Sequence, residues 1–180
     1  MPTTVTLKLG DPAPEFALPG VDGKTYRLAD FQDKPVLCVI FMCNHCPYVK
    51  ATIDRMIAIQ RDYAAKGVQL VGMNANETNN YPEDDVPHMI QWAKQKGFNF
   101  PYLRDDSQAV ARAYGAERTP HLFLFDRNRK LRYTGAIDDN TQDPSKVKRR
   151  YLREAIDALL ANQPVADAHT PAMGCSIKWA

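Results

Sequence analysis

The sequence predicts an α/β fold, with a central mixed sheet flanked by helices. A continuous apolar run at residues 36–41, and mainly apolar runs at residues 68–73 and 121–125, have the length expected of buried strands. The segments between these runs carry apolar residues at helical spacing. Strands that alternate with helices form a sheet with helices on both faces.

The first predicted helix covers residues 47–66. Pro47 suits the first helical position, where a missing N–H costs little. Apolar side chains then recur at helical spacing, and Gly67 ends the pattern.

The middle of the chain predicts shorter elements. Residues 74–86 are polar and are expected to form a loop, and residues 87–96 are expected to form a helix. A short strand is expected at 100–103. A short helix follows at 107–114, with Ser107 as its N-cap.

The C-terminal part predicts a hairpin and a final helix. Residues 130–135 are expected to pair with the strand at 121–125 across a polar turn. The last helix is expected to begin at Asp143–Pro144, to carry a solvated basic run and to reach about residue 162. We therefore divide the chain into one domain at residues 1–163 and an extended tail at 164–180.

The charge balance excludes several kinds of partner. The 180 residues include 23 Lys and Arg against 21 Asp and Glu, which gives a formal net charge of +2. This balance argues against nucleic acid or an anionic membrane as the main partner. No run approaches the roughly 18 apolar residues of a transmembrane helix. Because residues 1–11 lack the features of a secretory signal, we expect a cytoplasmic protein.

Two of the four cysteines form a Cys-x-x-Cys pair between a predicted strand and a predicted helix. Cys43 and Cys46 are this pair, while Cys38 lies inside the strand. Too few cysteines are present for a disulfide scaffold, so the pair indicates redox chemistry or a metal. A four-ligand zinc site would need His45, His121 or Cys175 from elsewhere in the chain, so we favour redox work and predict no metal.

The first turn of a helix favours a thiolate, because its N–H groups are unpaired and its dipole is positive. With Pro47 at the first helical position, Cys46 is the expected N-cap and Cys43 lies on the approaching loop. His45, between the two sulfurs, can add positive charge when protonated, or it is a solvated loop residue.

Two further signals lie outside this pair. Thr119-Pro120 precedes the third apolar run, and a cis proline there would leave backbone groups free to pair with an extended thiol substrate. Cys175 lies in the tail. It is either a second resolving cysteine, within or between subunits, or an incidental thiol in a loosely ordered segment.

The motifs together resemble the redoxin branch of the thioredoxin superfamily, which includes peroxiredoxin-like proteins and thiol-disulfide oxidoreductases. The resemblance implies a thioredoxin fold with an N-terminal extension, and it spans nearly the whole chain. It lies in these segments: residues 10–18, 22–24, 28–31, 44–50, 81–84 and 174–179.

The resemblance allows two chemistries, and the residues favour one. In the peroxiredoxin pattern, Cys46 lies at the position of the peroxide-reacting cysteine. Three other positions of the pattern differ: Cys43 stands in place of a threonine, Val39 in place of a proline and Pro120 in place of an arginine. Because groups that would position a peroxide are replaced, thiol-disulfide exchange is favoured over peroxide reduction. Arg118, two residues before Pro120, keeps the peroxidase alternative open.

The sequence leaves the order of the two sulfurs open. Direct matching to thioredoxin makes Cys43 the nucleophile, whereas the strand length and Pro47 make it Cys46, which we prefer. We predict an enzyme that forms a mixed disulfide with protein or low-molecular-weight thiols and disulfides, without a cofactor besides its cysteines. Thr119 and Pro120 are the predicted substrate-binding residues. A metal-binding or interaction module is the non-enzymatic alternative, and a monomer and a dimer are equally compatible with the sequence.

Overall fold

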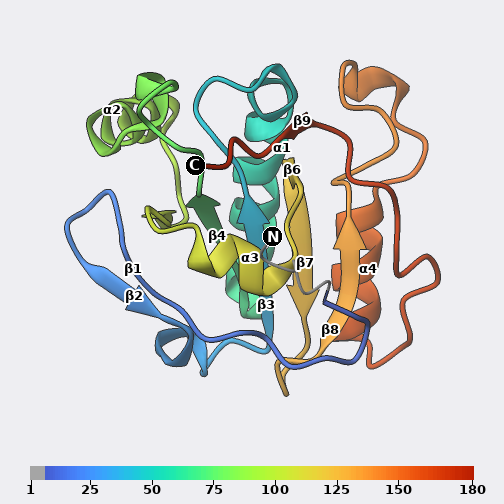
Figure 1. Cartoon of the computed structure of the whole chain (residues 1–180). Coiled ribbons are helices and arrows are strands. Elements are labelled where there is room, and N and C mark those ends of the chain that lie inside the picture. The colour runs from blue at the N-terminus through green and yellow to red at the C-terminus, as the bar shows by residue number, and fades with distance from the viewer. Residues whose placement is uncertain (1–6) are drawn as a thin grey trace.

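The computed structural model describes residues 7–180 and contains a five-stranded mixed sheet (Figure 1). The central strand β3 (Val36–Phe41) pairs in parallel with β4 (Val68–Asn74) and antiparallel with β7 (His121–Phe125). At the two edges, β5 (Tyr102–Arg104) is parallel to β4 and β8 (Leu131–Gly135) is antiparallel to β7. This arrangement confirms the predicted mixed sheet. The expected cytoplasmic location was based on residues 1–11. Residues 1–6 of that segment lie outside the described residues.

Helices cover both faces of the sheet. Residues of α1, α2 and α4 share one buried apolar cluster, and residues of α3 belong to a second cluster on the other face. None of the helices within residues 7–180 combines the length and apolar character that crossing a bilayer requires. The remaining elements are the following: α1 (Pro47–Tyr63), α2 (Val86–Lys96), α3 (Ala109–Tyr114), α4 (Tyr151–Leu160), β1 (Ala17–Pro19), β2 (Thr25–Arg27), β6 (Arg118–Thr119) and β9 (Cys175–Ser176).

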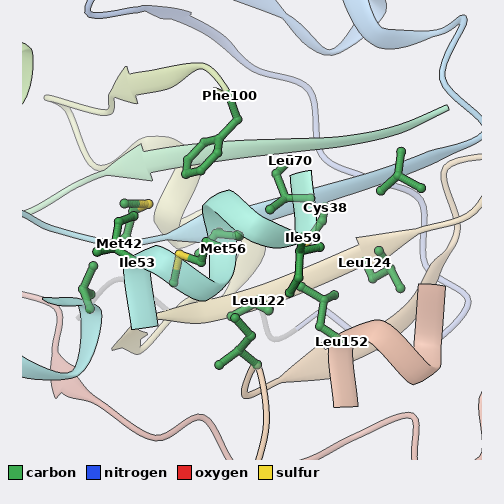
Figure 2. Close-up of a cluster of buried hydrophobic side chains, with 14 of the residues drawn as sticks. Cys38, Met42, Ile53, Met56, Ile59, Leu70, Phe100, Leu122, Leu124 and Leu152 are labelled. Carbon is green, nitrogen blue, oxygen red and sulfur yellow. The ribbon is translucent and has the colours of Figure 1, made fainter. Parts of the chain in front are cut away.

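The alternation of side chains along β3 produces the two clusters. Cys38 and Ile40 face the side of α1, and Val39 and Phe41 face the side of α3. All six residues of β3 are buried. Figure 2 shows the first cluster, where side chains of α1 and α4 pack onto the sheet. Because both faces of the strand are covered, its sequence is continuously apolar rather than alternating.

The connection from β3 to α1 follows the predicted pattern. Cys46 is the N-cap residue, with φ −67° and ψ 123°, and Pro47 occupies the first turn. After α1 and a short 3₁₀ turn, Gly67 has a φ of +83°. A Cβ atom at Gly67 would lie 2.6 Å from the ring of Pro35, so both the backbone angle and the space require glycine.

The last helix begins later than the sequence predicts. A 3₁₀ turn covers residues 144–146, but α4 starts only at Tyr151. Residues 148–150 are basic, and the positive end of the helix dipole disfavours basic side chains in a first turn. Asp139 also pairs with this segment, because its carboxylate accepts a hydrogen bond from the backbone N–H of Lys148. Most of the basic run therefore precedes α4 instead of lying on it.

Two other boundaries also differ. The N-cap of α3 is Gln108, not Ser107, because the carboxylate of the buried Asp105 accepts hydrogen bonds from N–H groups in the first turn of α3. The predicted strand at 100–103 begins instead at Tyr102.

The tail at residues 164–180 packs against the domain. Its strand β9 pairs antiparallel with β6, and His169 pairs with Thr134 of β8. Ile177 is 3% exposed and belongs to the cluster on the α3 side. In Figure 1 the tail, in red, runs along the upper end of the sheet beside β6. The described tail is therefore ordered against the domain, in contrast to a loosely ordered segment.

We predict that Leu70→Ala lowers the free energy of unfolding by about 2–5 kcal/mol, because Leu70 is fully buried between the sheet and α1. Urea denaturation measures this change. The control is Ile90→Ala on α2, where the side chain is 44% exposed, and its expected effect is within about 0.5 kcal/mol. Equal losses in the two variants would contradict the assignment of Leu70 to the core.

Candidate active site

The two neighbouring cysteines lie at the carboxyl end of β3, where the chain enters α1. Cys43 is on the connection and Cys46 is the N-cap residue of the helix. Both thiols are enclosed, with exposed fractions of 1% for Cys43 and 0% for Cys46. Both side chains also reach the segment before β7, since each sulfur contacts Thr119.

Cys46 is the sulfur that the surroundings ionise. Its pKa is lowered to about 4, mainly by a hydrogen bond with the Cys43 thiol. Weaker contributions come from Thr119, from Cys175 and from the backbone N–H of Val49 in the first turn of α1. When protonated, Cys46 donates its S–H to the carbonyl oxygen of Thr119 across 3.3 Å. The helix end and the hydrogen bond from Cys43 therefore favour the thiolate form of Cys46.

The pKa of Cys43 is shifted in the opposite direction. Its pKa is raised because its proton is shared with the Cys46 sulfur, because it is buried and because Asp84 lies nearby. Its Sγ lies 3.5 Å from the hydroxyl of Thr119. Cys38 is fully buried in β3, and burial raises its pKa. Of the three buried cysteines, Cys46 is the one whose pKa is lowered. The order of the two sulfurs stays a prediction.

Thr119 and Pro120 lie directly beside the cysteine pair. The peptide bond between them is cis. Their role in substrate binding stays a prediction. Thr119 contributes its hydroxyl to Cys43 and its carbonyl oxygen to Cys46. The structure therefore brings these predicted site residues together with the cysteines.

His45 lies beside a buried carboxylate. Its Nδ1 is 2.6 Å from Oδ2 of Asp84, which is fully buried, and its ring stacks on Tyr81. The nitrogen is nevertheless poorly aligned for a hydrogen bond, so the contact is best described as an ion pair that forms when the imidazole is protonated. His45 is thus partly buried and specifically placed, in contrast to the solvated loop residue that the sequence left open.

Asp84 is the residue that sequence reasoning missed. Its carboxylate accepts hydrogen bonds from the backbone N–H of Asn44 at 2.7 Å and from the side-chain amides of Asn74 and Asn76. Asp84 lies in a 3₁₀ turn at residues 82–84, inside the segment predicted as a loop. The signal for it was the pair of asparagines directly after the second apolar run, whose amides had no evident partner in the sequence.

Cys43, His45 and Asp84 together form the group that could hold a metal ion in the described part of the chain. Ligand atoms of Cys43, His45 and Asp84 all lie within 4.8 Å of one another, and zinc accepts sulfur, nitrogen and oxygen ligands. His121, the more distant ligand considered from the sequence, is not in this group. Its Nε2 lies 3.3 Å from the Thr134 hydroxyl, and burial lowers its pKa to about 4.

Cys175 lies on the other side of Cys46. It is directly opposite Thr119 in the pairing of β6 with β9, and it packs against the apolar cluster that contains Cys43 and Cys46. Its own pKa is raised to about 11, mainly by burial. Arg118 is exposed, and it donates to the carbonyl oxygen of Gly174 at 3.5 Å. Three sulfurs therefore meet at the start of α1.

The sheet, the cysteine pair at the start of a helix and the neighbouring cis proline define a thioredoxin-fold protein. The Redoxin family profile matches residues 8–150, and the chain belongs to this family.

Relatives with described functions agree with this assignment. The thiol-disulfide oxidoreductase ResA of Geobacillus thermodenitrificans is 29% identical over 124 residues, which cover 69% of this chain and 67% of the relative. A crystal structure of a putative thiol:disulfide interchange protein DsbE from Chlorobium tepidum matches with a TM-score of 0.71 and 28% identity, covering 86% of this chain and 99% of that one.

A further solved structure matches over almost the full length. A hypothetical protein of Sinorhizobium meliloti superposes with a TM-score of 0.92 and 39% identity, covering 98% of this chain and 97% of that one. The similarity therefore includes the tail as well as the Redoxin region.

We predict that the reduced protein contains a thiolate that titrates near pH 4, visible as ultraviolet thiolate absorbance. Cys43→Ala should raise this pKa, because it removes the thiol hydrogen bond from Cys43, which is the largest cause of the shift. Cys38→Ala is the control and should leave the titration unchanged. The assignment of the nucleophile would be wrong if Cys46→Ser kept the low-pH thiolate.

We also predict that Asp84→Ala lowers the free energy of unfolding by about 3 kcal/mol or more, because it leaves several buried donors without an acceptor. Thermal or urea unfolding measures the loss. The neighbouring Glu83→Ala is the matched control, since that side chain is 45% exposed. A loss no larger than that of the control would show that the buried carboxylate is not structurally required.

Proposed function

We propose that this protein is a thiol-disulfide oxidoreductase that works through Cys46 and Cys43. The observation that carries the proposal is the position of Cys46 at the start of α1, where Cys43 shares its proton with the Cys46 sulfur. Thr119 supports it, because its hydroxyl lies beside the Cys43 sulfur and its carbonyl oxygen beside the Cys46 sulfur. The names of the ResA and DsbE relatives support the same chemistry.

The reaction proceeds by two exchanges. The Cys46 thiolate attacks one sulfur of a substrate disulfide, a mixed disulfide forms, and the other substrate sulfur leaves as a thiolate. Cys43 then loses its proton and attacks Sγ of Cys46, which releases the second substrate thiolate and leaves a Cys43–Cys46 disulfide. Two electrons pass from the cysteine pair to the substrate. The reverse sequence oxidises substrate dithiols.

Peroxide reduction is the second candidate, because Cys46 also occupies the position of the peroxide-reacting cysteine. The geometry favours disulfide exchange instead. Arg118, the residue that kept the peroxidase alternative open, donates to Gly174 in the tail. Pro120 has no side-chain donor to offer a peroxide.

Metal binding is the non-enzymatic candidate, and the cluster of Cys43, His45 and Asp84 favours it. Oxygen atoms of Asp84 already accept hydrogen bonds from three donors. A metal would have to share this carboxylate with the three donors, which weakens the cluster as a metal site. We therefore favour the redox function. Metal analysis of the purified protein distinguishes the two functions.

The substrates we propose are protein or low-molecular-weight thiols and disulfides, with no cofactor beyond the cysteines. The cytoplasmic location stays a prediction, which cell fractionation tests. Sedimentation analysis decides between a monomer and a dimer, which the sequence left open.

We predict that the protein accelerates the reduction of insulin disulfides by dithiothreitol, and that Cys46→Ser abolishes the acceleration. Cys43→Ser should slow turnover and accumulate a mixed disulfide, because the resolving thiol is missing. Cys38→Ala, whose thiol is remote from the other three, is the control. A hydrogen peroxide consumption assay is run beside it, and peroxide turnover without insulin turnover would establish the peroxidase instead.

A further inference from the structure

The tail pairs with the backbone of β6, the strand that contains the predicted substrate-binding residue Thr119. Thr119, the residue before the cis proline, pairs with Cys175, and Arg118 pairs with Ser176. The backbone N–H of Ile177 donates to the carbonyl oxygen of Glu117 at 3.0 Å, which continues the ladder. A segment of the same chain is therefore bound as an extended strand where a thiol substrate would bind.

The register of this strand points the tail cysteine at the active site. Residues directly opposite each other in an antiparallel pair project their side chains from the same face. Because the Thr119 hydroxyl contacts Cys43, the opposite residue, Cys175, also projects toward the cysteine pair. Its side chain packs against the apolar cluster that contains Cys43 and Cys46.

Gly174, the residue before Cys175, lies very close to the backbone of Thr119. A Cβ atom at Gly174 would lie 1.9 Å from the carbonyl oxygen of Thr119, which no side chain tolerates. Glycine therefore allows the tail to approach the edge closely enough for Cys175 to reach Cys46.

The strand is anchored on both sides of Cys175. Before it, Thr170 bonds to the backbone of Thr134 and its hydroxyl accepts a hydrogen bond from the N–H of Ala136. After it, Ile177 is buried, and the backbone of Lys178 bonds to Asn76 and Glu77. These contacts keep the tail in place.

The three sulfurs differ in their access to solvent. Cys43 and Cys46 are enclosed, whereas Cys175 is half-buried. A thiol or disulfide in solution therefore meets Cys175 first. An enclosed thiolate next to a more accessible thiol is the arrangement expected of a relay.

We propose that residues 174–177 are a built-in substrate strand, and that Cys175 exchanges disulfides with Cys46 and passes them to thiols and disulfides in solution. This inference rests on the proposed function and names the sulfur through which substrates enter. The substrates it predicts are small disulfides and exposed cysteines, because the edge is already filled and offers no room for an extended peptide.

The exchange balances in both directions. In reduction, Cys175 gives its proton to solvent, and the resulting thiolate attacks an external disulfide; this thiolate is a small fraction at neutral pH, because the pKa of Cys175 is about 11. The attack forms a mixed disulfide on Cys175 and releases one external thiolate. The Cys46 thiolate then attacks Sγ of Cys175, a Cys46–Cys175 disulfide forms, and the second external thiolate leaves. Cys43 can next attack Cys46 and return Cys175 to its thiol. In oxidation, an external thiolate attacks Sγ of Cys175, and Cys46 leaves as a thiolate, which its low pKa favours. A second external thiolate then attacks the external sulfur of this mixed disulfide, the external disulfide is released, and Cys175 leaves and takes up a proton from solvent.

The test uses the full chain with Cys43→Ser, which leaves three cysteines and removes the competing disulfide. After incubation with oxidised glutathione, thiols counted under denaturing conditions should fall from three to one, and peptide mapping should find Cys46 joined to Cys175 within one chain. Adding Cys175→Ser should abolish this link. The proposal is overturned if Cys175 stays free, carries only glutathione or joins only a second chain.

Gly174→Val tests the role of the strand without touching a sulfur. In the Cys43→Ser background it should prevent the link, because the new side chain collides with the backbone of Thr119. Met173→Ala is the matched control one residue earlier, where the side chain is 52% exposed, and it should form the link normally. Melting curves of both variants show whether the domain stays folded. Normal link formation in folded Gly174→Val would refute the strand geometry.

The insulin assay separates this inference from the function on which it rests. Cys175→Ser, with Cys43 and Cys46 intact, should lose turnover to the level of Cys46→Ser. If it keeps or exceeds the turnover of the unmodified chain, the tail is not a relay, while the proposed function stands. If Cys46→Ser itself is fully active, the proposed function falls.

Discussion

The start of α1 is the constraint on which the rest of the site depends. A sulfur is ionised at neutral pH only where hydrogen-bond donors and a favourable field offset its burial. Under the proposed function Cys46 meets this condition, because Pro47 begins the helix directly after it and because the hydrogen bond from Cys43 lowers its pKa. The buried strand β3 sets the position of this helix, since both of its faces are packed. The apolar core thus determines where the thiolate lies.

The buried network around Asp84 supports the site from the opposite side. It connects the backbone of Asn44, between the two cysteines, to Asn74 at the end of β4. Tyr102 of β5 joins the same network by donating to the side chain of Asn44 at 2.7 Å. A buried polar network of this kind is stabilising only when its members are paired, and here it connects the cysteine loop to two strands.

Most of the fold could be predicted from the sequence, because it depends on local patterns. Continuous apolar runs identified β3, β4 and β7, and Pro47 located the start of α1. The start of α4 could not be predicted in the same way, since the apolar spacing continues through a basic stretch that the helix dipole disfavours. The environment of the site needed long-range contacts. Asp84 is 38 residues from Cys46 in the chain, and no periodicity connects them.

The two disulfides available to Cys46 differ in what they do to the unfolded chain. Cys43 is only three positions away, so a bond between these residues closes a very small ring and restricts the denatured polypeptide little. Cys175 is 129 positions away, so a bond to it closes a loop that contains most of the protein. In the chain-entropy account, the long loop removes far more disorder from the denatured ensemble. The free energy of unfolding of the oxidised protein would then show whether Cys46 is bonded to Cys43 or to Cys175.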